Sequence, residues 1–191
     1  MSGKSHEPVR MTDENFFMRD GLTVAPELVG KLIIRQHGDG IITLRITETE
    51  CYLGENDTAC HASKGRTPRT EMLYKSGGTI YVYLCYGIHC LMNIITGEAE
   101  QPQGVLIRAC ENYDGPGKLT KQLLIDRSFN GESILGNPRI WLAEDGYVPK
   151  IVRKKRVGID YAAPRDRDAL WRFCDKDKTC ARPKRKTGKK P

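Results

Sequence analysis

Apolar and polar residues alternate along 41–46, where isoleucine or leucine at every second position is separated by threonine and arginine. A period of two predicts a half-buried strand. A His-Gly-Asp-Gly turn precedes this strand, so 31–35 and 41–52 are predicted to pair as an antiparallel hairpin. The alternation continues into Glu48 and Glu50, which predicts that both carboxylates lie on the core-facing side of the strand.

A second hairpin is predicted farther along the chain. The run 79–86 is rich in β-branched and aromatic residues, which favour strands, and apolar residues resume over 91–95. Tyr86 precedes a glycine between the two runs, so it is predicted to lie at or near the hairpin tip. Another apolar strand is predicted at 104–109.

The predicted helices are short. Segment 23–30 is typical of a helix that is capped by Thr23 and ends at Gly30. A Gly-Pro-Gly-Lys entry opens a second helix over 115–125, and backbone amides at such an entry can receive a phosphate. Weaker signals predict a short helix at 57–62 and two late strands, one at Trp141 and one at 157–161.

These elements predict an α+β fold, with one domain built on an antiparallel sheet, short helices around the sheet and a protruding β-hairpin. The domain is predicted to span 14–174. Segment 1–13 is polar and without periodicity, and 175–191 is a basic tail, so both ends are predicted to be disordered. A chain of 191 residues can bury a core without disulfides.

Cysteine usage argues against a disulfide scaffold and against a metal site. The seven cysteines are odd in number and include no C-x-x-C pair. Cys51, Cys60 and His61 match no zinc-ligand spacing, so no metal is predicted. The polar start of the sequence predicts no signal peptide, and no apolar stretch approaches the length of a membrane span. A reducing compartment is expected, either the nucleus or the bacterial cytoplasm, with no membrane partner.

The formal charge of +7 is concentrated in two clusters. Segment 150–156 holds five cations in seven residues, and segment 182–190 holds six in nine with no acid. Such clusters favour polyanions such as nucleic acids. For the tail, a solvated end without a partner is an alternative. For 150–156 the polyanion interpretation is favoured, because that cluster interrupts a segment that is otherwise predicted to fold.

The two acids of the first hairpin are the leading candidates for chemistry. A buried carboxylate is costly unless it is paired or used in function. One alternative is an ion pair with Arg45 or Arg66. Tyrosine, histidine and arginine follow within about twenty residues, and this density favours a site.

Aromatic residues of the second hairpin allow two interpretations. Tyr81, Tyr83 and Tyr86 lie in one short run, and aromatic residues in strands are most often packed in the core. A tyrosine next to glycine at a turn is exposed, however. An exposed ring beside a basic surface could act as a wedge between DNA bases. Asn93, in the second arm of the hairpin, is by itself typical of a turn or strand-edge residue.

Several blocks of the chain resemble one known family. They occur in its order over residues 16 to 173 and comprise Glu48-Thr-Glu50-Cys-Tyr52-Leu-Gly, His61, Gly65-Arg66-Thr-Pro-Arg69, Tyr81-Val-Tyr83-Leu-Cys-Tyr86-Gly87, Met92-Asn93, Val105-Leu-Ile-Arg108-Ala, Gly115-Pro-Gly-Lys118-Leu and Arg156-Val-Gly-Ile-Asp. In these blocks the chain resembles the 3-methyladenine (alkyladenine) DNA glycosylases. It departs from their pattern at Cys51, where alanine is more usual, and over 174–191.

The resemblance implies a monofunctional enzyme that flips alkylated or deaminated purines out of duplex DNA and hydrolyses the N-glycosidic bond. Glu50 matches the family's general base, and Arg108 helps to hold the attacking water. The resemblance also implies a curved form for the sheet. It implies a base pocket formed by Tyr52, His61, Tyr83 and Asn93. It also implies that Tyr86 intercalates into the DNA.

The expected partner is double-stranded DNA with damaged purines, bound by a monomer that needs no cofactor. Backbone phosphates are expected to be contacted by Arg66, Lys118, Arg153, Lys154 and Lys155. A non-catalytic nucleic-acid-binding module on the same fold is the alternative. Glu50 and Arg108 distinguish the two, because a carboxylate near phosphates would repel the ligand of a pure binder. A zinc deaminase is rejected because its H-x-E and P-C-x-x-C motifs are absent.

Overall fold

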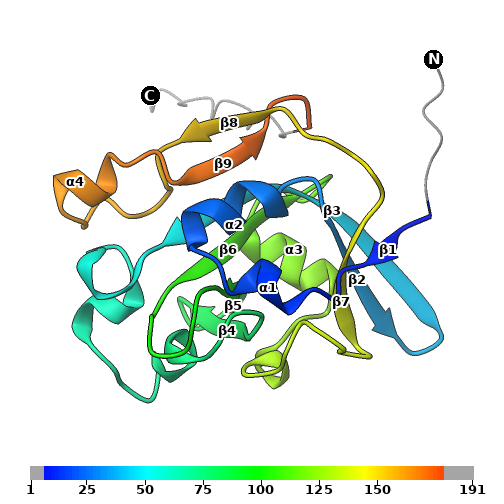
Figure 1. Cartoon of the computed structure of the whole chain (residues 1–191), viewed down its shortest axis with the longest axis horizontal. Helices are drawn as coiled ribbons and strands as arrows, with labels where there is room; N and C mark the ends of the chain where they lie inside the picture. Colours follow the sequence, from blue (N-terminus) through cyan, green and yellow to red (C-terminus); the bar gives the residue numbers. More distant parts are fainter. Residues whose placement is uncertain (1–6, 179–191) are drawn as a thin grey trace, which may run out of the picture.

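The computed structural model describes residues 7–178 of the chain. They form a single domain with a curled antiparallel half-barrel sheet and a few short helices (Figure 1). This arrangement confirms the predicted α+β class. The predicted disorder of 179–191 and of the first six residues lies outside the described residues.

The sheet has the strand order β1-β7-β2-β3-β6-β5-β4, and β9 pairs with both β3 and β8. Every strand pairing is antiparallel. The strands are β1 (Val9–Arg10), β2 (Leu32–His37), β3 (Gly40–Tyr52), β4 (Ile80–Cys85), β5 (His89–Ile95), β6 (Gly104–Cys110), β7 (Ile140–Glu144), β8 (Ile151–Lys154) and β9 (Arg172–Asp175). Both predicted hairpins are confirmed, as β2–β3 and β4–β5.

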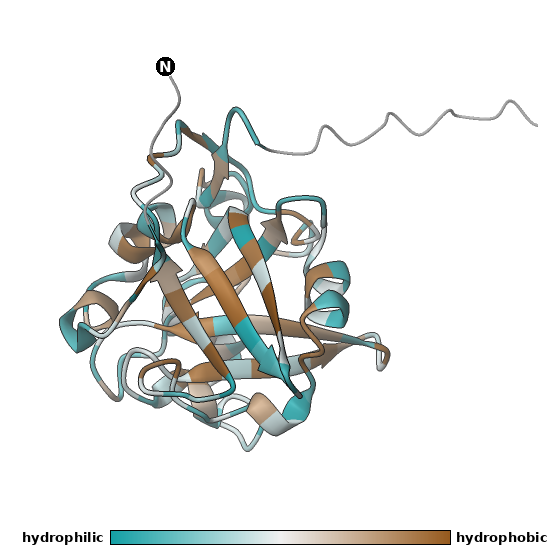
Figure 2. Ribbon diagram, turned by 90° about the vertical axis from the view of Figure 1, so that its right-hand side faces the viewer, coloured by the Kyte–Doolittle hydropathy of each residue, from teal (hydrophilic) through white to brown (hydrophobic). Residues whose placement is uncertain are grey.

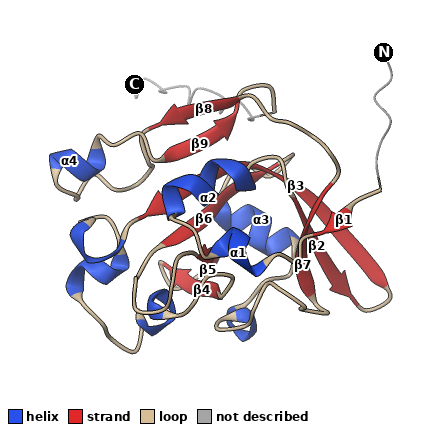
Figure 3. Ribbon diagram, viewed as in Figure 1, coloured by secondary structure: helices blue, strands red, loops and turns tan. Residues whose placement is uncertain are grey.

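Short helices surround the strands (Figure 3). They are α1 (Glu14–Phe17), α2 (Gly21–Leu28), α3 (Pro116–Gln122) and α4 (Pro164–Arg167), with 3-10 turns η1 (Gly54–Asn56), η2 (His61–Lys64), η3 (Glu71–Tyr74) and η4 (Arg127–Phe129). Helix α2 packs against β3 and β6, and α3 packs against β5 and β6. Together they cover the apolar face of the sheet. No helix within residues 7–178 is both long and apolar enough to cross a membrane.

The main core lies between this face of the sheet and the helices. Figure 2 shows apolar residues concentrated in the strands and polar residues in the connecting loops. The largest fully buried side chains include Phe17, Phe129, Phe173, Leu28, Ile33, Ile46, Met92 and Ile107. Burial of one such side chain stabilises the fold by about 1.5–3 kcal/mol.

The start of the predicted disordered tail is ordered. Asp175 belongs to β9, and Lys178 Nζ lies 3.2 Å from Glu111 Oε1. The helix predicted over 115–125 is shorter, because α3 ends at Gln122, and the helix predicted at 57–62 is replaced by the 3-10 turn η2.

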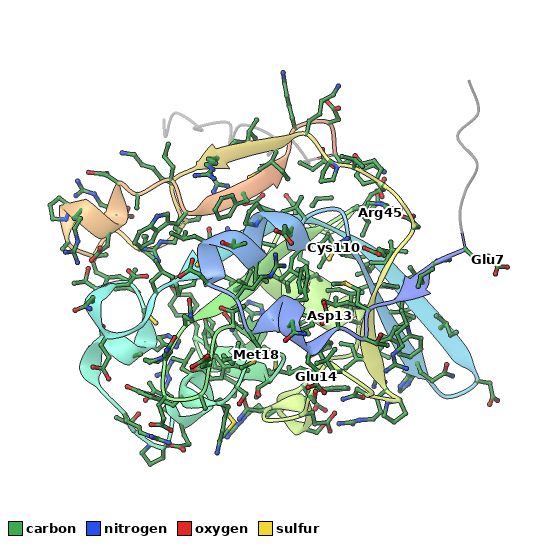
Figure 4. The ribbon with its side chains drawn as sticks, in the orientation of Figure 1. Glu7, Asp13, Glu14, Met18, Arg45 and Cys110 are labelled. Carbon is green, nitrogen blue, oxygen red and sulfur yellow. The ribbon has the colours of Figure 1, made fainter. Side chains whose placement is uncertain are left out.

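Three further sequence predictions about elements need correction. Residues 7–13 are ordered rather than disordered: β1 pairs with β7, and the Asp13 side chain (Figure 4) caps α1. Helix α2 begins earlier than predicted because Asp20, not Thr23, caps it by accepting from Leu22 N–H. Segment 157–161 is not a strand but a loop, in which Gly158 has a φ of +76° and ladder pairing is absent.

Candidate functional site

A cavity of about 650 Å³ opens between β3, β6, the β4–β5 hairpin and the loop that follows β8. Its volume is in the range that small-molecule sites occupy. The seven residues predicted for catalysis, the base pocket and intercalation all line it: Glu50, Tyr52, His61, Tyr83, Tyr86, Asn93 and Arg108. The fold therefore brings together side chains that are up to 58 positions apart in the sequence, from Glu50 to Arg108.

A double irregularity in the β3–β6 ladder turns Glu50 toward this cavity. The pairing passes from Ile46–Cys110 to Glu48–Ala109 and then to Thr49–Ile107, so the register skips one residue on each strand, Thr47 and Arg108. A bulge reverses the inward and outward alternation that follows it. Beyond it, Thr49 faces the core and donates to the Ala25 carbonyl of α2 at 2.7 Å. Cys51 lies in the main core, so Glu50 projects to the opposite face.

This geometry corrects the predicted orientation of the acids. Continuous alternation would put Glu48 and Glu50 on the same face as Ile46, which is in the main core. Both carboxylates are buried, but neither pairs with Arg45 or Arg66. Arg172 on β9 donates to Glu48 at 2.7 Å. Arg45 (Figure 4) instead donates to both carboxylate oxygens of Asp145, at 3.0 and 2.5 Å.

The Glu50 carboxylate is held by three groups from three segments. Its Oε2 accepts from the Tyr52 hydroxyl at 3.0 Å, and its Oε1 accepts from the Val157 backbone N–H at 2.9 Å. Arg108 Nε lies 3.3 Å from Oε1. Only 1% of Glu50 is exposed, and this burial raises the pKa of its carboxyl, although Arg108, Val157 N–H and the Tyr52 hydroxyl act in the opposite direction. The site thus holds a carboxylate with increased basicity in one orientation.

Aromatic rings form one wall of the cavity. The His61 and Tyr83 ring centroids are 4.6 Å apart in an edge-to-face arrangement, and those of Tyr81 and Tyr83 are 5.4 Å apart. His61 Nδ1 lies 3.0 Å from the Tyr81 hydroxyl oxygen. Burial lowers the pKa of His61 to about 4, and the charges of Arg69 and Lys64 act in the same direction. His61 is therefore neutral at physiological pH, and the wall offers flat, uncharged surfaces suited to a heterocyclic base.

Asn93 lines the cavity from β5. It is buried opposite Tyr81 on β4, and its side-chain amide donates to the Tyr81 carbonyl at 3.2 Å. This bond fixes the amide at the cavity wall. The alternative of a turn or strand-edge role for Asn93 does not apply, because the residue lies within a strand with neighbours on both sides.

The tip of the β4–β5 hairpin carries an exposed ring. Tyr86 is 92% exposed and has a φ of 51°, and Gly87 has a φ of 72°. Positive φ at both central positions suits a tight hairpin turn, which Ile88 N–H closes on the Cys85 carbonyl at 3.2 Å. A bulky residue with positive φ is uncommon. This tip therefore holds an aromatic ring in solvent at the edge of the cavity.

A second buried ion pair, between Arg156 and Asp57, lies next to the site. Arg156 donates to both carboxylate oxygens of Asp57, at 2.5 and 2.8 Å, and to the Cys51 and Asp166 carbonyls. Its guanidinium carbon lies 4.7 Å from the Tyr52 ring centroid and 4.9 Å from that of Trp171. Burial opposes its charge, yet Asp57 outweighs burial and raises the pKa of Arg156. Arg156 is thus buried rather than part of the surface cluster 150–156.

The residues expected to contact phosphates lie on the surface in different surroundings. Arg66 is paired with Glu71 and Glu100, and Lys118 with Asp114. Lys155 is paired with Asp168, whereas Arg153 lies over the Phe173 ring at 5.4 Å. Lys154 is exposed on β8 and forms no ion pair with residues of the described part of the chain.

Other residues line the cavity or hold the acids without having been predicted from the sequence. Val157 acts through its backbone N–H, which has no side-chain signal. Tyr161 is 72% exposed at the rim, and its hydroxyl donates to the Ala59 carbonyl at 3.2 Å. Arg69 also lines the cavity, and its position beside Arg66 in a Gly-Arg-Thr-Pro-Arg block could have indicated it. Within residues 7–178 no cluster of His, Cys, Asp or Glu is placed to hold a metal ion.

Comparisons with known proteins show which family the chain belongs to. The family model described as methylpurine-DNA glycosylase matches residues 15–114 and 111–179. A protein of Psychrobacter cryohalolentis is 41% identical over 178 residues, which cover 78% of this chain and 84% of the relative. One from Borrelia garinii subsp. bavariensis is 43% identical over 178 residues, covering 86% and 96%. One from Methanocella arvoryzae is 39% identical over 188 residues, covering 87% and 92%.

All three relatives carry the name "Putative 3-methyladenine DNA glycosylase". The class that the cavity and the matches define is a base-excising DNA repair protein. The chain belongs to the methylpurine-DNA glycosylase family. This confirms the resemblance drawn from its motifs, and it supports a DNA glycosylase role, that is, a hydrolase acting on N-glycosyl bonds.

Proposed function

We propose that this protein is a monofunctional DNA glycosylase that flips alkylated or deaminated purines from duplex DNA and releases them by hydrolysis. The observation that carries the proposal is Glu50, a buried carboxylate held by Tyr52, Val157 and Arg108 inside a cavity lined by aromatic rings. A site that only bound DNA would gain nothing from a buried acid, because carboxylates repel phosphates.

In the proposed reaction Glu50 is the general base. Its carboxylate takes a proton from water as the water oxygen bonds to the sugar C1′, and the base leaves with the electrons of the broken C1′–N bond. Positive charge develops on the sugar in an oxocarbenium-like transition state, which the same carboxylate stabilises. Arg108 helps to hold the water. The product is an abasic site, and no lysine nucleophile takes part.

The cavity is proposed to receive the flipped base between Tyr52, His61 and Tyr83. Flipping costs a few kcal/mol, least where damage has already weakened base pairing. The exposed ring of Tyr86 is proposed to fill the gap left in the duplex. This role is consistent with its place at an exposed hairpin tip beside the cavity.

Asn93 is proposed to exclude normal guanine. The bond from its amide to the Tyr81 carbonyl fixes it at the wall, where it would clash with the exocyclic 2-amino group of guanine. Adenine-derived lesions and hypoxanthine lack that group. Asn93→Ser should therefore raise excision of guanine relative to hypoxanthine, most of all in mismatched pairs. An unaltered guanine-to-hypoxanthine ratio in a folded variant would remove Asn93 from the selectivity argument.

The protein is proposed to act as a monomer on double-stranded DNA. Arg66, Lys118, Arg153, Lys154 and Lys155 remain the proposed contacts to backbone phosphates. The deciding experiment incubates the full chain with duplexes that each carry one modified base, among them hypoxanthine, etheno-adenine and 3-methyladenine, and scores alkali-labile cleavage. Cleavage at one or more lesions is expected. Lesion binding without cleavage would favour the non-catalytic binding module, and cleavage without added alkali would contradict the monofunctional assignment.

A further inference from the structure

Two arginines of the loop between η2 and η3 differ in their partners, although both are exposed. Arg66 donates from Nε and Nη2 to the Glu71 carboxylate, at 2.8 Å each, and from Nη1 to Glu100 at 2.5 Å. Its charge is therefore compensated within the protein. Arg69 lines the cavity, and no carboxylate of residues 7–178 forms an ion pair with it.

Arg69 is also the only uncompensated charge in the described cavity lining. The charged side chains there are Glu50, Arg69 and Arg108, and Glu50 is paired with Arg108. His61 is neutral, because burial and the nearby cations Arg69 and Lys64 lower its pKa to about 4. Arg69 lies at the aromatic wall, with its guanidinium carbon 6.0 Å from the Tyr83 ring centroid. The charged side chains of the lining thus sum to one positive charge, which Arg69 carries at an exposed position.

A nucleotide that enters the cavity brings its phosphates to the opening, since base, sugar and phosphate are covalently joined. Guanidinium matches the phosphodiester group in geometry and charge, and it can donate two parallel hydrogen bonds. Resting on the proposed function, we propose that Arg69 binds a backbone phosphate of the damaged strand next to the flipped nucleotide. It is a positioning residue that holds the strand while Glu50 acts on the sugar.

The test combines changes in the protein with changes in the DNA. Duplexes carry hypoxanthine and, one at a time, an uncharged methylphosphonate at each phosphate flanking it. Affinity is measured over a range of salt concentrations with the full chain carrying Glu50→Gln, so that base release is too slow to change the duplex during the titration. Arg69→Ala should lower the salt slope by about 0.9, the value for one phosphate contact. Arg69→Lys keeps the charge and should restore most of the slope.

One methylphosphonate position should weaken binding of the protein that retains Arg69 but cost the Arg69→Ala protein nothing further. Arg66→Ala should change the slope less than Arg69→Ala, because Arg66 is already compensated by Glu71 and Glu100. Both side chains are exposed, so thermal melting should show both variants folded.

The proposal is overturned if Arg69→Ala leaves the salt slope unchanged, or if every methylphosphonate weakens both proteins equally. Failure of the proposed function would look different: the unmodified protein would then excise no base from any duplex. With excision present and the phosphate effects absent, only the role of Arg69 is wrong.

Discussion

Two buried arginine–carboxylate pairs lie close together in this fold, and they differ in how closely arginine and carboxylate bind each other and in whether they face the cavity. Asp57 and Arg156 share two short hydrogen bonds, and the terminal nitrogens of Arg156 also donate to two backbone carbonyls. Glu50 and Arg108 share a single approach of 3.3 Å and both line the cavity. The first pair is enclosed by protein, whereas the second faces the space that a substrate would occupy.

The difference separates a structural pair, Asp57–Arg156 (the enclosed pair), from the pair proposed to act in catalysis, Glu50–Arg108 (the open pair). Buried ion pairs add little net stability, but removing one partner leaves an uncompensated charge and is costly. Arg156 joins Tyr52 to Trp171, and the next residue holds Glu50 through its N–H. We infer that the enclosed pair fixes the loop and the ring that orient the open pair. Substitutions in the two pairs should therefore have different effects on catalysis and on folding.

The largest expected effect is on catalysis through the open pair. Glu50→Gln keeps the shape of the side chain but removes its basicity, so excision should slow by about 10² to 10⁴. Lesion binding should be preserved or slightly tighter. Single-turnover excision and gel-shift titration measure the two quantities, and a variant that excises at the parent rate would show that Glu50 is not the base.

The same substitution should also change how stability depends on pH. Burial raises the folded-state pKa of Glu50, so the native state binds more protons than the unfolded state, and stability falls as pH rises through that pKa. Glutamine at position 50 cannot ionise, so the variant does not lose this stability as pH rises. Its effect on the free energy of unfolding should therefore be more favourable at pH 7 than at pH 4, in urea titrations at both values. Equal effects would contradict a raised pKa.

The enclosed pair should instead affect folding. Arg156→Leu leaves Asp57 buried without a cation and should lower the free energy of unfolding by about 3–5 kcal/mol. Arg108→Leu should lower the free energy of unfolding by less, because Glu50 keeps its hydrogen bonds to Tyr52 and Val157 and can take up a proton. Urea titration of both variants makes the comparison, and the Arg156→Leu, Asp57→Leu double variant should recover much of the loss. Equal losses of unfolding free energy in Arg156→Leu and Arg108→Leu would contradict the proposed difference between the two pairs.

A smaller effect is expected at the exposed hairpin tip. Tyr86→Ser should weaken binding to lesion-containing duplex by about 1–3 kcal/mol, the range for one aromatic ring that stacks on a base. Binding to the same lesion in single-stranded DNA should change little, because no gap then needs filling. Ile41→Ser, at another exposed position, is the control for general effects of removing apolar surface. Unchanged duplex affinity for Tyr86→Ser would leave its ring without a role in flipping.

Much of this architecture could be predicted because it depends on local patterns. Period-two alternation found β3, the turn at 37–40 paired it with β2, and aromatic and β-branched runs found the β4–β5 hairpin with Tyr86 at its turn. The motif blocks identified seven residues that line one cavity. The strands follow from properties of neighbouring residues, which a sequence displays directly, whereas the seven site residues came from the resemblance to a known family.

The remaining features depend on tertiary contacts that neighbouring residues do not reveal. The irregularity at Thr47 and Arg108 exists only in the pairing of two strands, yet it decides which way Glu50 points. Val157 contributes a backbone N–H that any residue except proline would have. Arg156 looked like a surface cation because Asp57, its partner, lies 99 positions away. Segment 157–161 has strand-like composition but is used as a wall of the cavity.

The Tyr52 hydroxyl should have a modest effect that pH reveals. Tyr52→Phe keeps the ring but removes the donor to Glu50, so the pKa of Glu50 should rise further and the acidic limb of the rate profile should move to higher pH. One neutral hydrogen bond is worth about 0.5–1.5 kcal/mol, which limits the movement to about one pH unit. Tyr83→Phe is the control, because Tyr83 also lines the cavity but is not among the groups that hold the Glu50 carboxylate. An unmoved limb would show that the Tyr52 bond does not act on Glu50.

The smallest effect is expected from the cations of β8 and its edge, and here the buried Arg156 must be left intact. Neutralising Arg153, Lys154 and Lys155 together should lower the salt slope of DNA binding by at most about 0.9 for each phosphate that is no longer neutralised, with lesion preference unchanged. Of the three single substitutions, Lys154→Gln should lower the salt slope most, because Lys155 is paired with Asp168 and Arg153 packs over an aromatic ring.

Lys150→Gln is the matched control for this cluster, since Lys150 is exposed and already paired with Asp177. The salt slopes of DNA binding are measured for the parent protein and each variant, on one duplex with and without a lesion. If the triple variant keeps the parent slope, β8 faces away from DNA, and the positive charge that the sequence concentrates there has no part in binding. If the slope falls but lesion preference also changes, β8 acts on the cavity through the loop that Arg156 anchors, and the enclosed pair would then connect the DNA surface to the open pair.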